Sequence, residues 1–163
     1  MFEQKPQKNA AGIDIYKPED FEGMRKAGKL AAETLDMITE YVQPGITTDE
    51  LDQKCYDFIV KNGAIPAPLY YLGNNKWDES GKNGYQKTTC ISINHVVCHG
   101  IPGERKLVDG DILNIDVTVI VDGWFGDTSR MFVAGDKVSV KAQKLMDITY
   151  ECLMRSIEIV KPG

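Results

Sequence analysis

Apolar and polar residues alternate from Ile112 to Val121, and a second extended pattern resumes at Trp124. Such alternation predicts a strand with one buried face. The Asp122-Gly123 pair between the two segments is the strongest short-range signal for a two-residue hairpin turn. We therefore predict an antiparallel hairpin in which Val121 pairs with Trp124. One face of its first strand is continuously apolar and carries Ile115, Val117, Val119 and Val121.

The opposite face of this hairpin carries two acids. A two-residue turn places Thr118 opposite Asp127, so Asp116 and Asp127 become diagonal neighbours, about 7 to 8 Å apart at the backbone. Both carboxylates can then reach one divalent ion or an ion pair. A solvated outer face is the other explanation. Ile120 and Phe125 on the same face argue against it, because carboxylates beside apolar groups need a partner or a metal.

Three segments show the apolar spacing of helices. The first begins near Lys17-Pro18, where proline followed by acids is typical of a first turn, and ends at about Val42. The second begins with the capping-box pattern Thr47-Thr-Asp-Glu50 and stops at Asn62-Gly63. The third runs from about 139 to 160. Its apolar stripe consists of Leu145, Ile148, Cys152 and Ile157.

Two short strands are predicted between the second helix and the hairpin, at about 89–94 and 96–99. The chain also ends with Val160-Lys-Pro-Gly163, which resembles Val42-Gln-Pro-Gly45. Duplication would explain this match. The common use of Pro-Gly to end helices also explains it, and on the residues alone this second explanation is favoured. If the repeat is real, we expect a truncated two-repeat protein.

Composition narrows the classes of function. A chain of 163 residues, 42% hydrophobic and 26% charged, is enough for one globular domain. A formal charge of −5 without a run of Lys or Arg gives no electrostatic footprint for nucleic acid. The N-terminus lacks the apolar core of a signal peptide, and no apolar run approaches the roughly 18 residues that span a bilayer. We expect a cytoplasmic protein that binds neither nucleic acid nor membrane.

The thiol and imidazole side chains are few. Cys55, Cys90, Cys98 and Cys152 contain no Cys-x-x-Cys pair, so we expect mostly reduced thiols packed as small apolar groups. The two histidines, His95 and His99, are four residues apart, a spacing typical of a helical metal pair. The surrounding valines, glycine and proline instead favour a strand followed by a turn, which argues against a shared metal site. Just before that turn, His99 could present its imidazole to a substrate as a donor or general acid.

Several motifs together resemble one known family. They are Cys90-Ile-Ser-Ile-Asn-His-Val-Val-Cys-His-Gly-Ile-Pro102, Asp109-Gly-Asp-Ile-Leu-Asn-Ile-Asp-Val-Thr118, Gly123-Trp-Phe-Gly-Asp-Thr-Ser-Arg-Met-Phe132, Met24-Arg-Lys-Ala-Gly28 and the Pro44-Gly45 junction. This pattern resembles the type I methionine aminopeptidases of bacteria and organelles, within metallopeptidase family M24. A related proline dipeptidase is a poorer match to the His-Gly-Ile-Pro context.

The resemblance implies an α/β (α+β) fold of the "pita-bread" type, with two pseudo-symmetric halves around a dinuclear metal centre. This chain would supply the first half plus the first helix of the second. We expect residues 1–14 to be an N-terminal extension and residues 15–163 a partial peptidase domain, truncated at the C-terminus. The pseudo-symmetry would also account for the internal repeat.

The resemblance further implies a metal-dependent hydrolase. Asp116 would chelate one divalent ion and Asp127 would bridge two, which could be Co, Mn, Fe or Zn. His99 would contact the substrate, position the scissile peptide and stabilise its developing charge. The expected activity is removal of the initiator methionine from nascent polypeptides, with possible proximity to the ribosome.

The same family resemblance aligns Tyr71, Tyr85 and Cys90 with the pocket for the methionine side chain, and ordinary core packing is the alternative. The first departure from the family pattern lies near this pocket. A polar insertion from Gly73 to Asn83 is expected to form a surface loop on the pocket rim, and Gln86 replaces the usual proline.

The second departure concerns the metal site itself. The family takes three further ligands, one histidine and two glutamates, from the half that follows, and this chain ends at Gly163 before them. Two aspartates alone would leave most coordination positions to water. The alternatives therefore include a non-catalytic fragment or binding protein that retains the fold, and a pair of copies that meet through the surface of the missing half.

Overall fold

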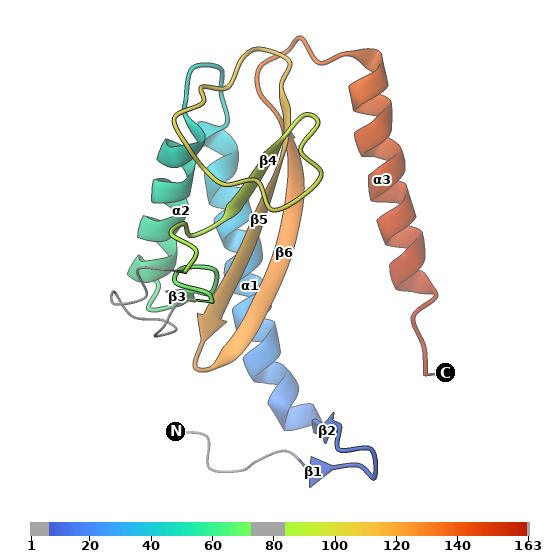
Figure 1. The fold of residues 1–163 in the computed structure, drawn as a ribbon. Helices are drawn as coiled ribbons and strands as arrows, with labels where there is room; N and C mark the ends of the chain where they lie inside the picture. Colours follow the sequence, from blue (N-terminus) through green and yellow to red (C-terminus); the bar gives the residue numbers. More distant parts are fainter. Residues whose placement is uncertain (1–6, 73–83, 163) are drawn as a thin grey trace.

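The computed structural model describes residues 7–72 and 84–162 (Figure 1). The predicted insertion at 73–83 lies outside these ranges. The helical elements are η1 (Pro18–Asp20), α1 (Phe21–Ile38), η2 (Thr39–Tyr41), α2 (Thr48–Lys61) and α3 (Val140–Glu158). The strands are β1 (Gln7–Lys8), β2 (Asp14–Ile15), β3 (Ile65–Pro66), β4 (Cys90–Ile93), β5 (Ile112–Val121) and β6 (Trp124–Val133).

The three predicted helices are confirmed. The second shows the capping box in full: the Glu50 N–H donates to Thr47 Oγ1 at 3.1 Å, and the Thr47 N–H donates to Glu50 Oε2 at 2.8 Å. These reciprocal bonds satisfy amides that have no partner within the helix. The helix therefore begins where the local sequence predicts.

The prediction of one of the two short strands is wrong. The segment 89–94 contains β4, but residues 96–99 form no strand. The chain turns away from the sheet at Asn94, whose φ of 51° is left-handed and ends the extended backbone. The valine-rich composition predicted extension here, but the turn at Asn94 overrides that preference.

The predicted β5–β6 hairpin is confirmed with its register. Val121 pairs with Trp124, and Thr118 pairs with Asp127. Asp122 and Gly123 have φ angles of 50° and 81°, which are the two left-handed conformations that a type I′ turn requires. The turn therefore fixes which side chains share a face along both strands.

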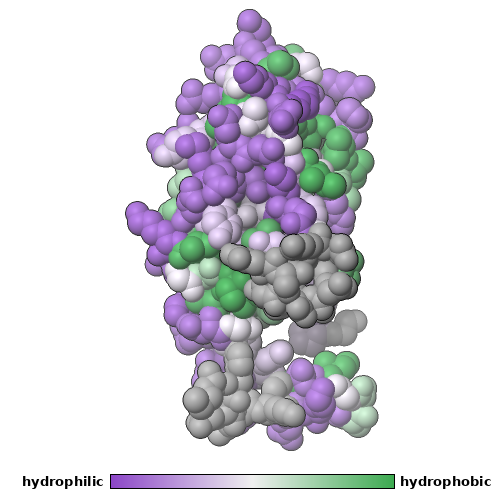
Figure 2. Space-filling view, turned by 60° about the vertical axis from the view of Figure 1, so that its left-hand side comes forward, coloured by the Kyte–Doolittle hydropathy of each residue, from purple (hydrophilic) through white to green (hydrophobic). Residues whose placement is uncertain are grey.

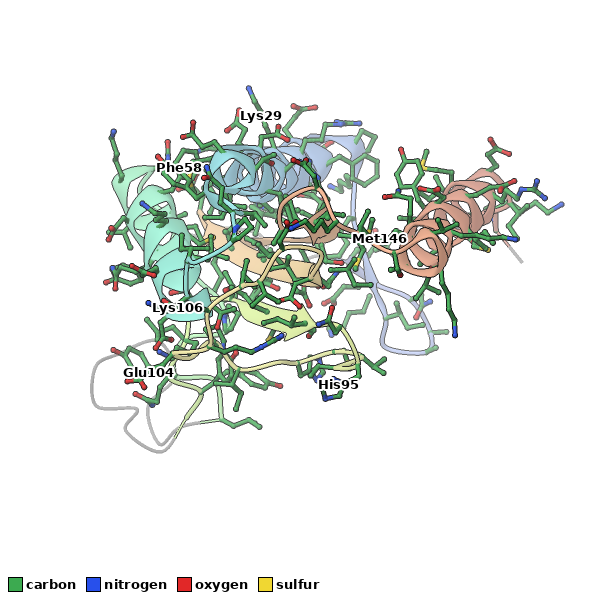
Figure 3. The ribbon with its side chains drawn as sticks, turned by 90° about the horizontal axis from the view of Figure 1, so that it is seen from above. Lys29, Phe58, His95, Glu104, Lys106 and Met146 are labelled. Carbon is green, nitrogen blue, oxygen red and sulfur yellow. The ribbon has the colours of Figure 1, made fainter. Side chains whose placement is uncertain are left out.

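β5 is the central strand of the main sheet. It pairs with β6 along its whole length on one side, and on the other side with β4 and then β3. The helices α1 and α2 cover one face of this sheet, and Figure 3 shows their labelled residues Lys29 and Phe58 on the side opposite His95. The apolar positions of β5 that were predicted to be buried lie in this core: Ile115, Val117, Val119 and Val121.

Close contact between α1 and β6 depends on a glycine. A Cβ added at Gly126 would lie 2.2 Å from the carbonyl oxygen of Ala27, whose own side chain is fully buried. Because the obstacle is backbone rather than a movable side chain, any larger residue must push the helix away from the strand. Gly126 therefore sets the spacing between the helix layer and the sheet.

The last helix, α3, lies beside the sheet rather than over it (Figure 1). It contains no buried residue. The apolar residues of its predicted stripe are exposed: the exposed fraction is 60% for Leu145, 47% for Ile148 and 56% for Ile157. Of the four cysteines, Cys55 is buried and Cys90 is partly buried, whereas Cys98 and Cys152 are exposed, so the expected packing holds for only part of the set.

The side of the molecule shown in Figure 2 is largely hydrophilic, with separate hydrophobic areas between the polar ones. No helix within the described ranges is long and apolar enough to cross a membrane.

Substitution Gly126→Ala should lower the free energy of unfolding by about 1 to 3 kcal/mol, because overpacking forces the Ala27 backbone away from β6. Urea denaturation followed by circular dichroism measures this change. Gly28→Ala in α1 is the matched control, since its added Cβ meets nothing within 4 Å. That control should stabilise the protein by roughly 0.5 to 1 kcal/mol through helix propensity. Equal effects of the two substitutions would contradict the close-contact interpretation.

Candidate metal and substrate site

A cavity of about 860 Å³ opens on the sheet face opposite the α1 core, and all six candidate residues line it. They come from four parts of the chain: the segment after β3, the start of β4, the loop after β4 and the β5–β6 hairpin. The six residues are Tyr71, Tyr85, Cys90, His99, Asp116 and Asp127. Neighbouring apolar side chains complete the wall, among them Leu72, Ile101 and Phe125.

The hairpin register brings the two acids to this cavity. Asp116 pairs across the sheet with Cys90 of β4 on one side and with Ser129 of β6 on the other. Thr118 and Asp127 are the next cross-strand pair on the same face. Thr118 Oγ1 donates a hydrogen bond to Asp127 Oδ1 at 3.1 Å. The acids are the predicted diagonal neighbours, and Thr118 orients the second of them.

The electrostatics of the pair favour a bound cation. Burial raises the pKa of Asp116, the negative charge of Asp127 raises it further, and His99 partly offsets both. The negative charge of Asp127 makes ionisation of Asp116 more costly, and a divalent cation between the two carboxylates relieves their repulsion. Carboxylate oxygens are ligands that such cations accept. The residues present therefore fit part of a metal site. Within the described ranges, no group of three or more His, Cys, Asp or Glu side chains is placed to hold an ion.

Backbone hydrogen bonds hold the tyrosines of the cavity wall together. The Tyr85 N–H donates to the Tyr71 carbonyl at 2.9 Å, and the Tyr70 N–H donates to the Tyr85 carbonyl at 2.6 Å. The Tyr85 hydroxyl donates to the Thr89 carbonyl at 2.8 Å, and burial raises the pKa of this phenol. Tyr71 is 50% exposed, so core packing does not explain its position.

A buried acid anchors the segment just before Cys90. This acid was not predicted from the sequence. Asp52 of α2 is only 7% exposed. Its Oδ1 accepts from the Thr89 N–H at 2.8 Å, from Thr89 Oγ1 at 2.7 Å and from the Thr88 N–H at 3.1 Å. Burial raises the pKa of Asp52, and these hydrogen bonds oppose that rise. Nothing local distinguishes Asp52 from Asp49, an acid of the same helix, because its partners lie more than thirty residues later.

The two histidines differ in their relation to the cavity. His99 lines the cavity from the loop between β4 and β5. His95 is exposed and is not among the lining residues; Figure 3 shows it at the outer side of this loop. The arrangement offers one imidazole, two carboxylates and an apolar wall to a ligand that enters the cavity.

Known proteins share the sequence and the fold of this chain. Residues 22–163 match the model of Metallopeptidase family M24. The chain is 53% identical over 151 residues to methionine aminopeptidase from Rickettsia prowazekii, and 52% identical over 153 residues to methionine aminopeptidase from Escherichia coli strain K12. Each match covers 93% of this chain.

A crystal structure of methionine aminopeptidase from Rickettsia prowazekii superposes with a TM-score of 0.83, covering 93% of this chain and 56% of that one. This likeness confirms the predicted fold class, the first half of the α/β pita-bread fold with α3 beyond it. The chain spans about half the length of the curated relatives it matches, 54% and 53% of the two named above.

Substitution Asp52→Ala should lower the free energy of unfolding by roughly 3 kcal/mol, because it leaves the buried Thr88 and Thr89 amides without an acceptor. Asp52→Asn keeps an acceptor oxygen and should cost less. Chemical denaturation of the three proteins measures both values. A loss below about 0.5 kcal/mol for Asp52→Ala would contradict the anchoring role.

Substitution Asp116→Asn should increase the free energy of unfolding at pH 7 in buffer with a chelator. The pKa of Asp116 is raised in the folded state, so its ionised form destabilises the fold. That penalty is absent below the unfolded pKa of about 3.9 and develops as the pH rises through the higher folded-state value. Urea titrations from pH 3 to pH 8 test this, with Asp57→Asn on the exposed surface of α2 as control. A constant difference across that range would contradict it.

Proposed function

The chain belongs to metallopeptidase family M24, and from that membership we propose that it is part of a methionine aminopeptidase, which removes the N-terminal methionine of polypeptides. The observation that supports this most directly is the meeting of His99, Asp116 and Asp127 in one apolar-walled cavity. Identity above 50% to two methionine aminopeptidases supports the same activity.

Family membership implies dependence on divalent metal ions. We infer two ions, of Co, Mn, Fe or Zn, with Asp116 as a ligand of one and Asp127 shared by both. When bound, such ions polarise the scissile carbonyl and supply a nucleophile at neutral pH. The chain's own part is to hold the two carboxylates at a fixed separation, which the sheet does through paired backbones and the Thr118 hydrogen bond.

The other cavity residues act on the substrate. His99 donates a hydrogen bond to the reacting peptide and stabilises the charge that develops on it. Tyr71, Tyr85 and Cys90 surround the methionine side chain, for which a polarisable sulfur and aromatic rings are favourable contacts. Tyr85 is held by its hydroxyl bond to Thr89, so this part of the wall is fixed before a substrate arrives.

We propose nascent polypeptides that begin with methionine as the substrates, in the cytoplasm and near the ribosome. The named relatives are methionine aminopeptidases of two bacteria, and this supports the substrate class. The described residues include two of the five ligands that the family resemblance implies. Metal binding and turnover by this chain therefore need separate measurements.

Methionine release from a Met-Gly-Met peptide, with added Mn²⁺ or Co²⁺, tests the activity. Substitution Asp127→Ala should slow release by about 100-fold or more, because loss of an outer partner of a ligand already costs 10- to 100-fold. Asp57→Ala removes a carboxylate from the exposed surface of α2 and is the matched control. Equal rates in wild type and Asp127→Ala would overturn the assignment.

Isothermal titration with Mn²⁺ measures the site independently of turnover. The heat of binding should disappear in Asp116→Ala and persist in Asp57→Ala. Unchanged binding in Asp116→Ala would exclude this residue as a ligand. Asp116-dependent binding without methionine release would favour the alternative of a non-catalytic protein that retains the fold.

A further inference from the structure

The loop that carries His99 is fastened to β4 by two hydrogen bonds at one glycine. The Ile91 N–H donates to the Gly100 carbonyl at 2.8 Å, and the Gly100 N–H donates to Ser92 Oγ at 3.0 Å. We call this pair of bonds the Ser92 latch. One of the two bonds comes from the backbone of β4, and the other is accepted by the Ser92 hydroxyl.

The latch is tight and largely shielded from water. A Cβ added at Gly100 would lie 2.2 Å from the Ile91 carbonyl oxygen, so only glycine allows this approach. Ser92 is 4% exposed and is not among the residues that line the cavity. In the sheet it pairs with Asn114, two positions from the pairing of Cys90 with Asp116. Ser92 therefore lies on the cavity face, beneath the loop and out of reach of a ligand.

His99, the residue directly before the latch, has an unfavourable backbone. Its φ is 54°, in the left-handed region that a residue with a Cβ adopts only at a cost. Such a conformation persists where surrounding contacts determine it. The latch supplies these contacts, because it fixes both the N–H and the carbonyl of the next residue.

The remaining anchors of the loop are further from His99. At the start, Asn94 Nδ2 donates to Asp111 Oδ1 at 2.7 Å. At the end, Gly103 exchanges hydrogen bonds with Thr48 Oγ1 at 2.9 and 3.0 Å. Between these two points, the latch contains the hydrogen bonds nearest to His99 in the part of the chain that the structure describes.

We propose that Ser92 is a positioning residue that holds the His99 imidazole toward the reacting peptide through Gly100. This inference rests on the proposed function, since it assigns His99 the substrate contact. Ser92 itself touches neither substrate nor metal. Its loss should therefore affect the reaction step that uses His99 more than the binding of the methionine side chain by Tyr71 and Cys90.

The first test is structural and needs no turnover. Amide hydrogen exchange by NMR is measured for wild type, Ser92→Ala and Thr34→Ala. Thr34 is the matched control, because its buried hydroxyl donates to the Leu30 carbonyl at 2.8 Å within α1, far from the loop. Relative to that control, Ser92→Ala should speed exchange of the Gly100 amide by about ten-fold. The His99 ring signals, assigned against the one other histidine, should also shift in Ser92→Ala alone.

A second variant covers the case in which Ser92→Ala fails to fold. Ser92→Thr keeps the hydroxyl acceptor and should retain slow Gly100 exchange and the wild-type His99 signals. If Ser92→Ala and Thr34→Ala alter Gly100 and His99 equally, the hydroxyl stabilises the fold in general and the positioning role is overturned. The same conclusion follows if Ser92→Thr loses the protection while remaining folded.

The second test is kinetic, in the methionine-release assay with Mn²⁺. Ser92→Ala should lower kcat by about ten-fold with KM changed less than about three-fold, because the affected contact acts mainly in the transition state. Thr34→Ala should leave both constants near those of wild type. A rise in KM with unchanged kcat would overturn the proposal. If wild type releases no methionine, the proposed function fails, and the exchange comparison alone still decides whether Ser92 holds His99.

Discussion

The register of the β5–β6 hairpin is the constraint on which the other parts depend. Alternate positions of β5 face in opposite directions, so Val117 and Val119 pack beneath the helices while Asp116 and Thr118 face the cavity. A slip of one residue would exchange the two sets, burying carboxylates in the core and exposing valines. Because that exchange would cost much free energy, the observed register is far more stable than the registers shifted by one residue. The hydrophobic core thus holds the carboxylates in place as well as the fold.

The two faces of the sheet are coupled through β6. Gly126 lets the backbone of α1 lie against one face of the strand, and the next residue, Asp127, faces the cavity on the other. Any change in the distance between α1 and β6 therefore displaces one of the two proposed metal ligands. Rigid strands hold such ligands more precisely than loops do, and the close contact at Ala27 adds to that rigidity.

Buried polar side chains hold the parts of the site that the sheet does not. Asp52 fixes the segment before Cys90, and Ser92 fixes the loop after His99. Asp52 accepts two buried backbone N–H groups, and Ser92 accepts the N–H of Gly100. A buried N–H without a partner costs more free energy than a hydrogen bond returns. Burial of Asp52 carries its own penalty, visible in its raised pKa. The hydrogen bonds from Thr88 and Thr89 offset that penalty and hold the cavity wall in place.

Patterns within a few residues of one another were sufficient to predict the helices and the hairpin. The Asp122-Gly123 turn sets the register by local geometry, and the Thr47–Glu50 capping box starts α2, because both depend only on near neighbours. The hairpin register indicated Asp116 and Asp127, the turn after His99 indicated that histidine, and the family motifs added Tyr71, Tyr85 and Cys90. The strand predicted at 96–99 was wrong, since a turn at Asn94 overrode the preference of valine for extension. Only the tertiary structure decided that turn, the exposure of α3 and the anchoring role of Asp52. The turn and the anchoring depend on which distant groups arrive beside the side chains of Asn94 and Asp52, and the exposure of α3 depends on what packs against it. No spacing along the chain encodes either.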